Sequence, residues 1–228
     1  MLRSLIITLV LIATTGVAQA EISDQAARAC GVTPETIAAS RAAHPTLATF
    51  EQTAAFADRG TGPIRIIEFA DYSCPACRAL HPRWVAFSRA NPDVRISVVE
   101  YPIYGRTLIS RATGNRTLNA SYIAIAAGAQ GKQLAFHDAL MGIAGQVDDQ
   151  AIRLAAERSG LNFPVAQRTA RTPAIAARAD ANLNLARSLG FVGTPHVVVD
   201  GILLSRQRGW VFGQAECLVR ASRATRHS

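Results

Sequence analysis

Two cysteines stand in the tetrapeptide Cys74-Pro75-Ala76-Cys77, directly after an apolar run of strand length. A cysteine that follows a strand and opens a helix lies at the helix N-terminus, where free N–H groups and the helix dipole stabilise a thiolate. We therefore expect Cys74 to be a nucleophilic thiol. Cys77, one helical turn further on, is expected to close a disulfide with Cys74 and to resolve mixed disulfides.

Two other interpretations of these cysteines are a structural disulfide and a metal site. Together with His81 they have the spacing C-x2-C-x3-H, but a tetrahedral zinc site needs a fourth ligand, and the sequence offers no second paired cluster. His81 lies further along the helix, where a packed or capping role is the commoner one. We expect no bound metal and no other cofactor.

A second signal is Gly193-Thr194-Pro195, placed just before an apolar run. Proline has no backbone N–H and suits the start of a strand, and an X–Pro bond is where a cis peptide is tolerated. We expect a cis Thr194–Pro195 bond beside Cys74, where a free backbone edge would bind an extended substrate chain.

The N-terminus is typical of a cleavable secretory signal. Arg3 precedes a mainly apolar stretch, Leu5 to Ala13, which is followed by the small-residue ending Ala18-Gln19-Ala20. The stretch is short for a membrane span, which needs about 20 apolar residues, although a retained anchor is the alternative. We assign residues 1–20 to the signal and expect export to the periplasm.

The net charge and the number of cysteines further limit the classes of function and of fold. The net charge of +8 comes from arginines scattered along the chain, which favours a solvated surface over a nucleic-acid interface. Four cysteines are too few to staple a domain of this size. The two outside the tetrapeptide, Cys30 and Cys217, are expected to form a structural disulfide, with free thiols or an intermolecular bridge as the alternatives.

Local patterns predict an α/β fold. An Ala-rich, helical segment precedes a breaker at residues 60–63, and a strand at 64–70, a helix to residue 90 and a strand at 94–101 form a parallel unit. Residues 107–189 are expected to be helical throughout. A hairpin at 196–205 and a helix at 211–224 complete the sheet.

The chain resembles the DsbA-like branch of the thioredoxin superfamily, which includes DsbA and ScsC type proteins, from about residue 64 to the C-terminus. The resemblance is carried by four segments: Glu68-Phe69-Ala70-Asp71-Tyr72-Ser73-Cys74-Pro75-Ala76-Cys77, Tyr101-Pro102-Ile103-Tyr104-Gly105, Gly131-Lys132-Gln133-Leu134-Ala135-Phe136-His137-Asp138-Ala139-Leu140-Met141, and Leu189-Gly190-Phe191-Val192-Gly193-Thr194-Pro195.

The resemblance implies a thioredoxin fold with an inserted helical domain and an N-terminal helical extension. The parts would be the extension at 21–60, the first thioredoxin part at 61–106, the insertion and connecting helix at 107–189, and the second thioredoxin part at 190–228. It also implies that Cys74 is the nucleophile, Cys77 the resolving cysteine, and Thr194-Pro195 the substrate-docking loop. Glu68 would be the acid beneath the site, buried and able to move the proton of Cys77, unless it lies in water at the strand end.

The implied activity is thiol-disulfide exchange with cysteine-containing exported proteins, most simply as a DsbA-like oxidase. Ala76 stands where strongly oxidising members carry histidine, and Thr194 where isomerases also carry threonine, so an oligomeric ScsC-type isomerase or reductase is the alternative. That isomerase would assemble as a homo-oligomer through the extension, whereas a monomeric oxidase would pack it on its own domain. A membrane partner, either a DsbB-like oxidase or a DsbD-like reductase, would reset the cysteines. A non-catalytic metal- or peptide-binding module is a third hypothesis.

Overall fold

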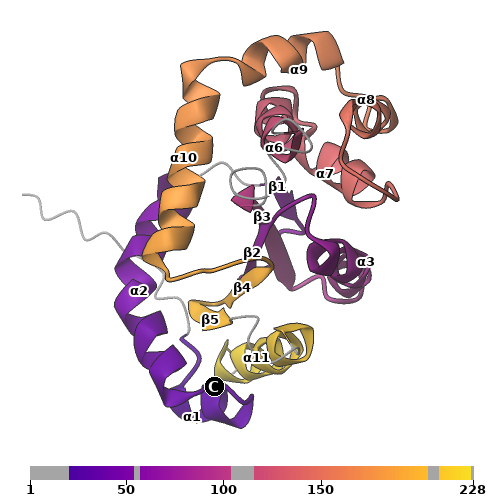
Figure 1. Cartoon of the computed structure of the whole chain (residues 1–228). Helices are drawn as coiled ribbons and strands as arrows, with labels where there is room; N and C mark the ends of the chain where they lie inside the picture. The colour runs from indigo at the N-terminus through magenta and orange to yellow at the C-terminus, as the bar shows by residue number, and fades with distance from the viewer. Residues whose placement is uncertain (1–20, 54–56, 104–115, 205–210, 227–228) are drawn as a thin grey trace, which may run out of the picture.

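Strand β2 (Ile64–Ala70) is buried at all seven positions and lies at the centre of a five-stranded sheet. The computed structural model describes residues 21–53, 57–103, 116–204 and 211–226. Figure 1 shows the sheet in the middle of the molecule, surrounded by helices. The strand order is β1-β3-β2-β4-β5, with the other strands being β1 (Ala57–Arg59), β3 (Val94–Glu100), β4 (His196–Val199) and β5 (Ile202–Leu204).

The expected parallel pair is formed by β2 and β3, which are connected through helix α3 (Pro75–Ala90). β4 pairs with the other side of β2 in antiparallel orientation, and β5 continues the hairpin. A β-branched run that is buried on both faces is typical of such a central strand. The thioredoxin-like fold predicted from the sequence is therefore confirmed.

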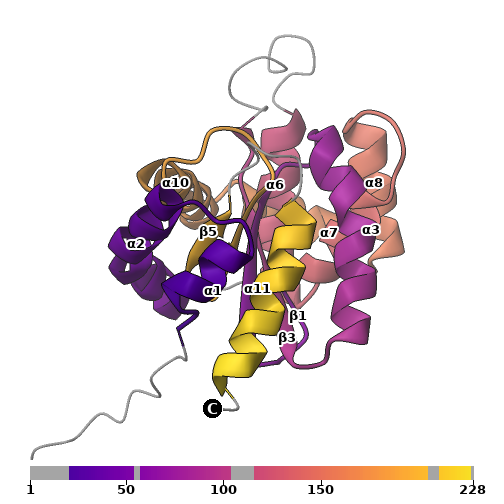
Figure 2. The ribbon, with the colours of Figure 1, turned by 90° about the horizontal axis from the view of Figure 1, so that it is seen from below.

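Side chains of β2 alternate between two cores, as the period of a strand requires. Ile64 and Ile66 point to the face that α3 and α11 (Val211–Arg226) cover, and Ile67 and Phe69 point to the face that α2 (Pro34–Thr53) and α10 (Pro173–Ser188) cover. Figures 1 and 2 both show α2 and α10 side by side on the second face. Glu68 belongs to the α3 face by this alternation.

A third core lies in the helical part between β3 and α10. It is built from α6 (Arg116–Ala127), α7 (Gln133–Met141), α8 (Asp149–Arg158) and α9 (Phe163–Ala170), with a short 3-10 turn, η1 (Gly128–Gln130). Cys74 and Cys77 belong to this core, because α3 packs against α7. The helical part therefore forms one wall of the cysteine site.

The N-terminal extension packs on its own domain. Helix α1 (Asp24–Ala29) ends at Cys30, whose sulfur is bonded to that of Cys217 on α11, with the Cα atoms 5.6 Å apart. Helix α2 contacts β5, and the Ser40 hydroxyl accepts a hydrogen bond from the backbone N–H of Leu203. Two independent connections thus hold the extension to the rest of the fold, one to α11 and one to β5.

One element differs from the sequence expectation. The segment assigned to the helical extension contains strand β1, which pairs antiparallel with β3 at the sheet edge. The helical region contains α9, a separate short helix, with Asn162 accepting a hydrogen bond from the N–H of Val165 at its start. The signal at 1–20 and the residues at 104–115 lie outside the described part of the chain, so the expected helix start near 107 lies there too. No helix within the described residues is long and apolar enough to cross a bilayer.

Candidate active site

Cys74 lies at the N-terminal end of α3, where its own backbone forms the cap and Pro75 occupies the first helical position. The strand β2 ends four residues earlier, and the Cys74 N–H donates to the Asp71 carbonyl, 3.1 Å away, to close the intervening turn. Cys74 therefore has the position predicted from the sequence, at the positive end of a helix dipole.

The Cys74 sulfur is surrounded by donors that favour a thiolate. Donation from the Cys77 thiol, and then from the Thr194 side chain and the N–H groups of Cys77 and Ala76, together lowers the pKa of Cys74 to about 5 against the opposing effect of burial. Cys74 is only 1% exposed. Its thiolate is thus stabilised by local hydrogen bonds rather than by water.

Cys77 differs from Cys74 in its surroundings. Its side chain is fully buried, and burial raises its pKa strongly, with further increases from the Cys74 sulfur and the charge of Glu68. In the described structure both cysteines are thiols. Cys74 is therefore the thiol that ionises readily and can act as the nucleophile, whereas Cys77 must first give its proton to an acceptor before it can react.

Glu68 is 3% exposed on β2, so the alternative that it lies in water at the strand end is wrong. Burial raises the pKa of Glu68 to about 7, while the charges of His137 and Arg59 act in the opposite direction. A carboxyl group with a pKa near neutrality can accept a proton and return it in the same reaction cycle. The charge of Glu68 in turn raises the pKa of Cys77.

The Thr194–Pro195 peptide bond is cis, and the Thr194 carbonyl lies 3.3 Å from the Cys74 sulfur. Gly193 precedes it with a φ of +94°, which an L side chain rarely adopts. Phe191 anchors the loop, because its carbonyl accepts from the Tyr101 hydroxyl. Its ring also stacks on His196, with the ring centroids 4.1 Å apart.

The sequence did not reveal the polar groups beside this site. The Tyr72 hydroxyl donates to Glu100 Oε1 at 2.7 Å, and His137 Nδ1 lies 3.2 Å from the same hydroxyl. All three are buried. His137 lies within a segment that supported the family resemblance, yet nothing in its local pattern indicates a contact 65 residues away.

His81 does not join the two cysteines in a C-x2-C-x3-H site. Its Nε2 lies 3.6 Å from Asp138 Oδ1 on α7, and its ring packs edge-on against that of His137 at 5.3 Å. The prediction that His81 is a packed side chain agrees with its burial, but it did not include the contacts with Asp138 and His137.

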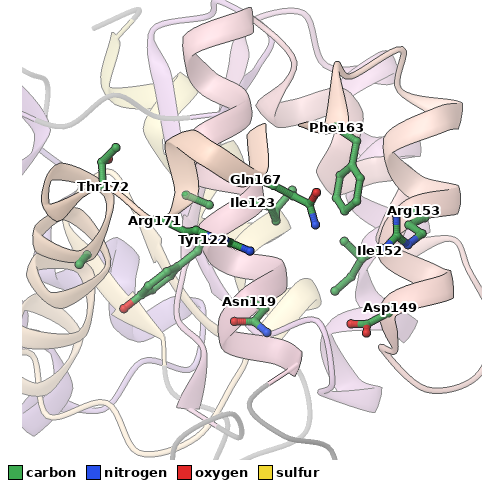
Figure 3. Close-up of a pocket in the computed structure, with 12 residues that line it drawn as sticks. Asn119, Tyr122, Ile123, Asp149, Ile152, Arg153, Phe163, Gln167, Arg171 and Thr172 are labelled. Carbon is green, nitrogen blue, oxygen red and sulfur yellow. The ribbon is translucent and has the colours of Figure 1, made fainter. Parts of the chain in front are cut away.

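The helical part also holds a cavity of about 480 Å³ (Figure 3). Helices α6, α8, α9 and α10 line it, and Phe163 and Ile152 face Arg171 and Asn119 across it. Neither Cys74 nor Pro195 contributes to its walls. This cavity is therefore separate from the cysteine site.

A thioredoxin-like sheet, a Cys-x-x-Cys pair at a helix N-terminus and an adjacent cis-proline loop define a thiol-disulfide oxidoreductase. Residues 65–217 match the family described as the DSBA-like thioredoxin domain, and the chain belongs to that family. No curated protein matches the chain.

Solved structures support this membership. A thioredoxin-like oxidoreductase from Silicibacter pomeroyi is 32% identical over 76% of this chain and 93% of its own, with a TM-score of 0.63. Two others are similar in fold, with TM-scores of 0.64 and 0.66. They are the catalytic domain of Proteus mirabilis ScsC, 20% identical over 83% of this chain and 99% of its own, and alpha-DsbA2 from Wolbachia pipientis, 18% identical over 86% and 99%.

The lowered pKa of Cys74 gives a pH prediction. Thiolate absorbance of the reduced protein should appear with a midpoint near pH 5 and should be absent in Cys74→Ser. Because the folded pKa lies below the unfolded value of 9.0, its contribution to stability grows as pH rises from about 5 to 9 and is lost as pH falls through 5. Thermal unfolding of the reduced and oxidised forms across this range measures the change. A midpoint near 9.0 contradicts it.

Proposed function

We propose that this oxidoreductase is exported to the periplasm and acts as a DsbA-like oxidase, donating the Cys74–Cys77 disulfide to cysteine-containing exported proteins. The observation that carries the proposal is the set of groups that donate to the Cys74 sulfur at the N-terminal end of α3. They stabilise the thiolate and hence the reduced form, which makes the corresponding disulfide a stronger oxidant.

The exchange has two steps. A substrate thiolate attacks the Cys74 sulfur of the oxidised pair, the Cys74–Cys77 bond breaks, and the Cys77 sulfur leaves with the electron pair. Glu68, in its protonated form, supplies the proton that this buried sulfur requires. A second substrate thiolate then attacks the substrate sulfur of the mixed disulfide and releases the Cys74 thiolate. The substrate is oxidised, and the pair is reduced.

The substrate would bind along the loop beside Cys74. Val192, which is 86% exposed three residues before Pro195, offers an apolar contact at the edge of this loop. The backbone next to the cis bond can pair with an extended segment of the substrate. A DsbB-like membrane oxidase would then restore the disulfide.

The ScsC-type alternative requires the N-terminal extension for assembly. The bond from Cys30 to Cys217 and the packing of α2 on β5 instead hold the extension on its own domain, which supports the monomeric oxidase. Light scattering should therefore give the mass of one chain.

The redox equilibrium of the pair with glutathione tests the oxidase assignment. We expect a reduction potential near that of the strong oxidant DsbA, about −120 mV, and not near that of thioredoxin, about −270 mV. The more reducing value would overturn the oxidase and favour a DsbD-like reductase as the membrane partner.

Glu68→Gln tests the proton step. The variant cannot protonate the leaving sulfur, so reduction of its disulfide by a thiol peptide should slow by roughly 10²-fold or more, the usual range for a general acid. Stopped-flow fluorescence measures the rate. Glu157→Gln, on the exposed surface of α8, is the matched control, and equal rates in both variants exclude the role of Glu68.

A further inference from the structure

Three potential metal ligands meet between α3 and α7, outside the cysteine pair. His81 comes from α3, His137 and Asp138 come from α7, and one ligand atom of each lies within 4.8 Å of the other two. Both histidines are buried. Within the described part of the chain, this is the one such cluster of three.

The orientation of His137 leaves one ring nitrogen available. Its Nδ1 faces the Tyr72 hydroxyl at 3.2 Å and Glu100 Oε1 at 3.8 Å, and the Tyr72 hydroxyl is itself hydrogen-bonded to that carboxylate. A ligating histidine usually binds metal through one nitrogen and donates its other N–H to a carboxylate or a similar acceptor. Glu100 and Tyr72 thus supply the outer contacts that would orient Nε2 toward His81 and Asp138.

The ligand types indicate the class of ion. Two imidazoles and one carboxylate suit a divalent transition ion, and three protein ligands with one open position are typical of zinc sites that retain a water molecule. The Asp138 side chain is 35% exposed, so the site can be reached from solvent.

Arg59 is the main obstacle to a cation. Its guanidinium forms an ion pair with Asp138 Oδ1, the oxygen that also faces His81. The ion pair neutralises the carboxylate, and a divalent ion would have to displace the guanidinium. The Arg59 side chain is 16% exposed at the end of β1, so it has a path to water. Arg59 and a metal ion therefore compete for one carboxylate.

We propose that His81, His137 and Asp138 form a zinc-binding site in which Arg59 occupies the carboxylate whenever the ion is absent. The fourth position belongs to a water molecule on the exposed side of Asp138. The bound ion would link the helix that carries Cys77 to the helical part of the fold. The site is independent of the proposed oxidase function.

Zinc titration of the full chain by calorimetry tests the proposal. The Cys74–Cys77 pair is first oxidised, so that its thiols cannot bind the ion. We expect one equivalent of zinc per chain, with affinity reduced at least about tenfold in His81→Gln and in Asp138→Asn. Arg59→Gln should bind about tenfold more tightly, because the competing cation is gone. His44→Gln, an exposed histidine paired with Glu21, should bind as the wild type does.

Cobalt provides a second readout. The visible spectrum of bound Co²⁺ should show a site with nitrogen and oxygen ligands, without the sulfur charge-transfer band that cysteine ligands produce. Circular dichroism verifies that each variant is folded. If one of His81→Gln, Asp138→Asn and Arg59→Gln does not fold, the zinc affinities of the other two test the proposal. The proposal is overturned if the wild type and Arg59→Gln bind no more zinc than His81→Gln, or if Arg59→Gln binds no more tightly than the wild type.

Discussion

Replacing Cys74 by serine should abolish thiol-disulfide exchange. The Cys74 sulfur is the one whose thiolate is stabilised, with a pKa of about 5, whereas the pKa of Cys77 is raised by burial. Oxygen in place of that sulfur can neither attack a disulfide nor be held in one. Oxidative refolding of a reduced protein substrate should therefore fall to the rate without enzyme.

Cys77→Ser should give a different result. Cys74 still attacks a substrate disulfide and releases one substrate thiolate, but no neighbouring thiol remains to resolve the mixed disulfide. Substrates should accumulate as adducts that non-reducing electrophoresis detects and a reductant removes. Ser73→Ala, one residue before the nucleophile, is the control and should turn over without trapping. Exchange activity in Cys74→Ser would contradict the role of Cys74 as the nucleophile. If the mixed disulfides of Cys77→Ser are resolved at the wild-type rate, Cys77 is not the resolving cysteine.

The cysteine pair and the strands around it could be predicted because their signals are local. β2 is a continuous β-branched run, and the proline after Cys74 occupies the first position of α3. Pro195 is likewise marked by Gly193, whose positive φ few other residues tolerate. Each signal depends on neighbours in the sequence, so one chain is sufficient to detect it.

The polar surroundings of the pair could not be predicted in the same way. His137 reaches Tyr72 only because α7 packs on α3, and that contact depends on how the helical part folds back. His81 shows the consequence. Its sequence position predicted a packed or capping side chain, whereas the fold also brings it to Asp138, 57 residues along the chain. β1 was missed for a related reason, because three residues at a sheet edge carry too little pattern.

Glu68 depends both on a local sequence signal and on contacts that only the fold provides. Its position six residues before Cys74 can be read in the sequence, but the pKa of about 7 arises from the helices that exclude water from it. A carboxyl group in water at the end of β2 would be ionised at neutral pH. The packing of α3 on the sheet thus gives Glu68 the raised pKa that the proposed proton transfer to Cys77 requires.

The bond between Cys30 and Cys217 closes a loop of 187 residues, and it connects α1 to α11 far from the reactive pair. In the chain-entropy model, a loop of this length gives stabilisation on the order of 5 kcal/mol, and measured losses for native disulfides are about 2–5 kcal/mol. Cys30 and Cys217 also pack within the core on the α3 and α11 face. Removal therefore acts on both the unfolded chain and the native packing.

We expect the double variant Cys30→Ala/Cys217→Ala to unfold roughly 5–15 °C below the oxidised wild type, since about 1 kcal/mol corresponds to 2–4 °C in a chain of this size. Thermal unfolding followed by circular dichroism measures the difference. Exchange activity below the transition should remain, because neither residue contacts Cys74. The matched control is Cys74→Ala/Cys77→Ala, which keeps the long-range bond and should retain most of the stability. If the two double variants unfold at the same temperature, the Cys30–Cys217 bond does not stabilise the fold. If alkylated Cys30 and Cys217 are recovered from the oxidised protein, the bond is absent in solution.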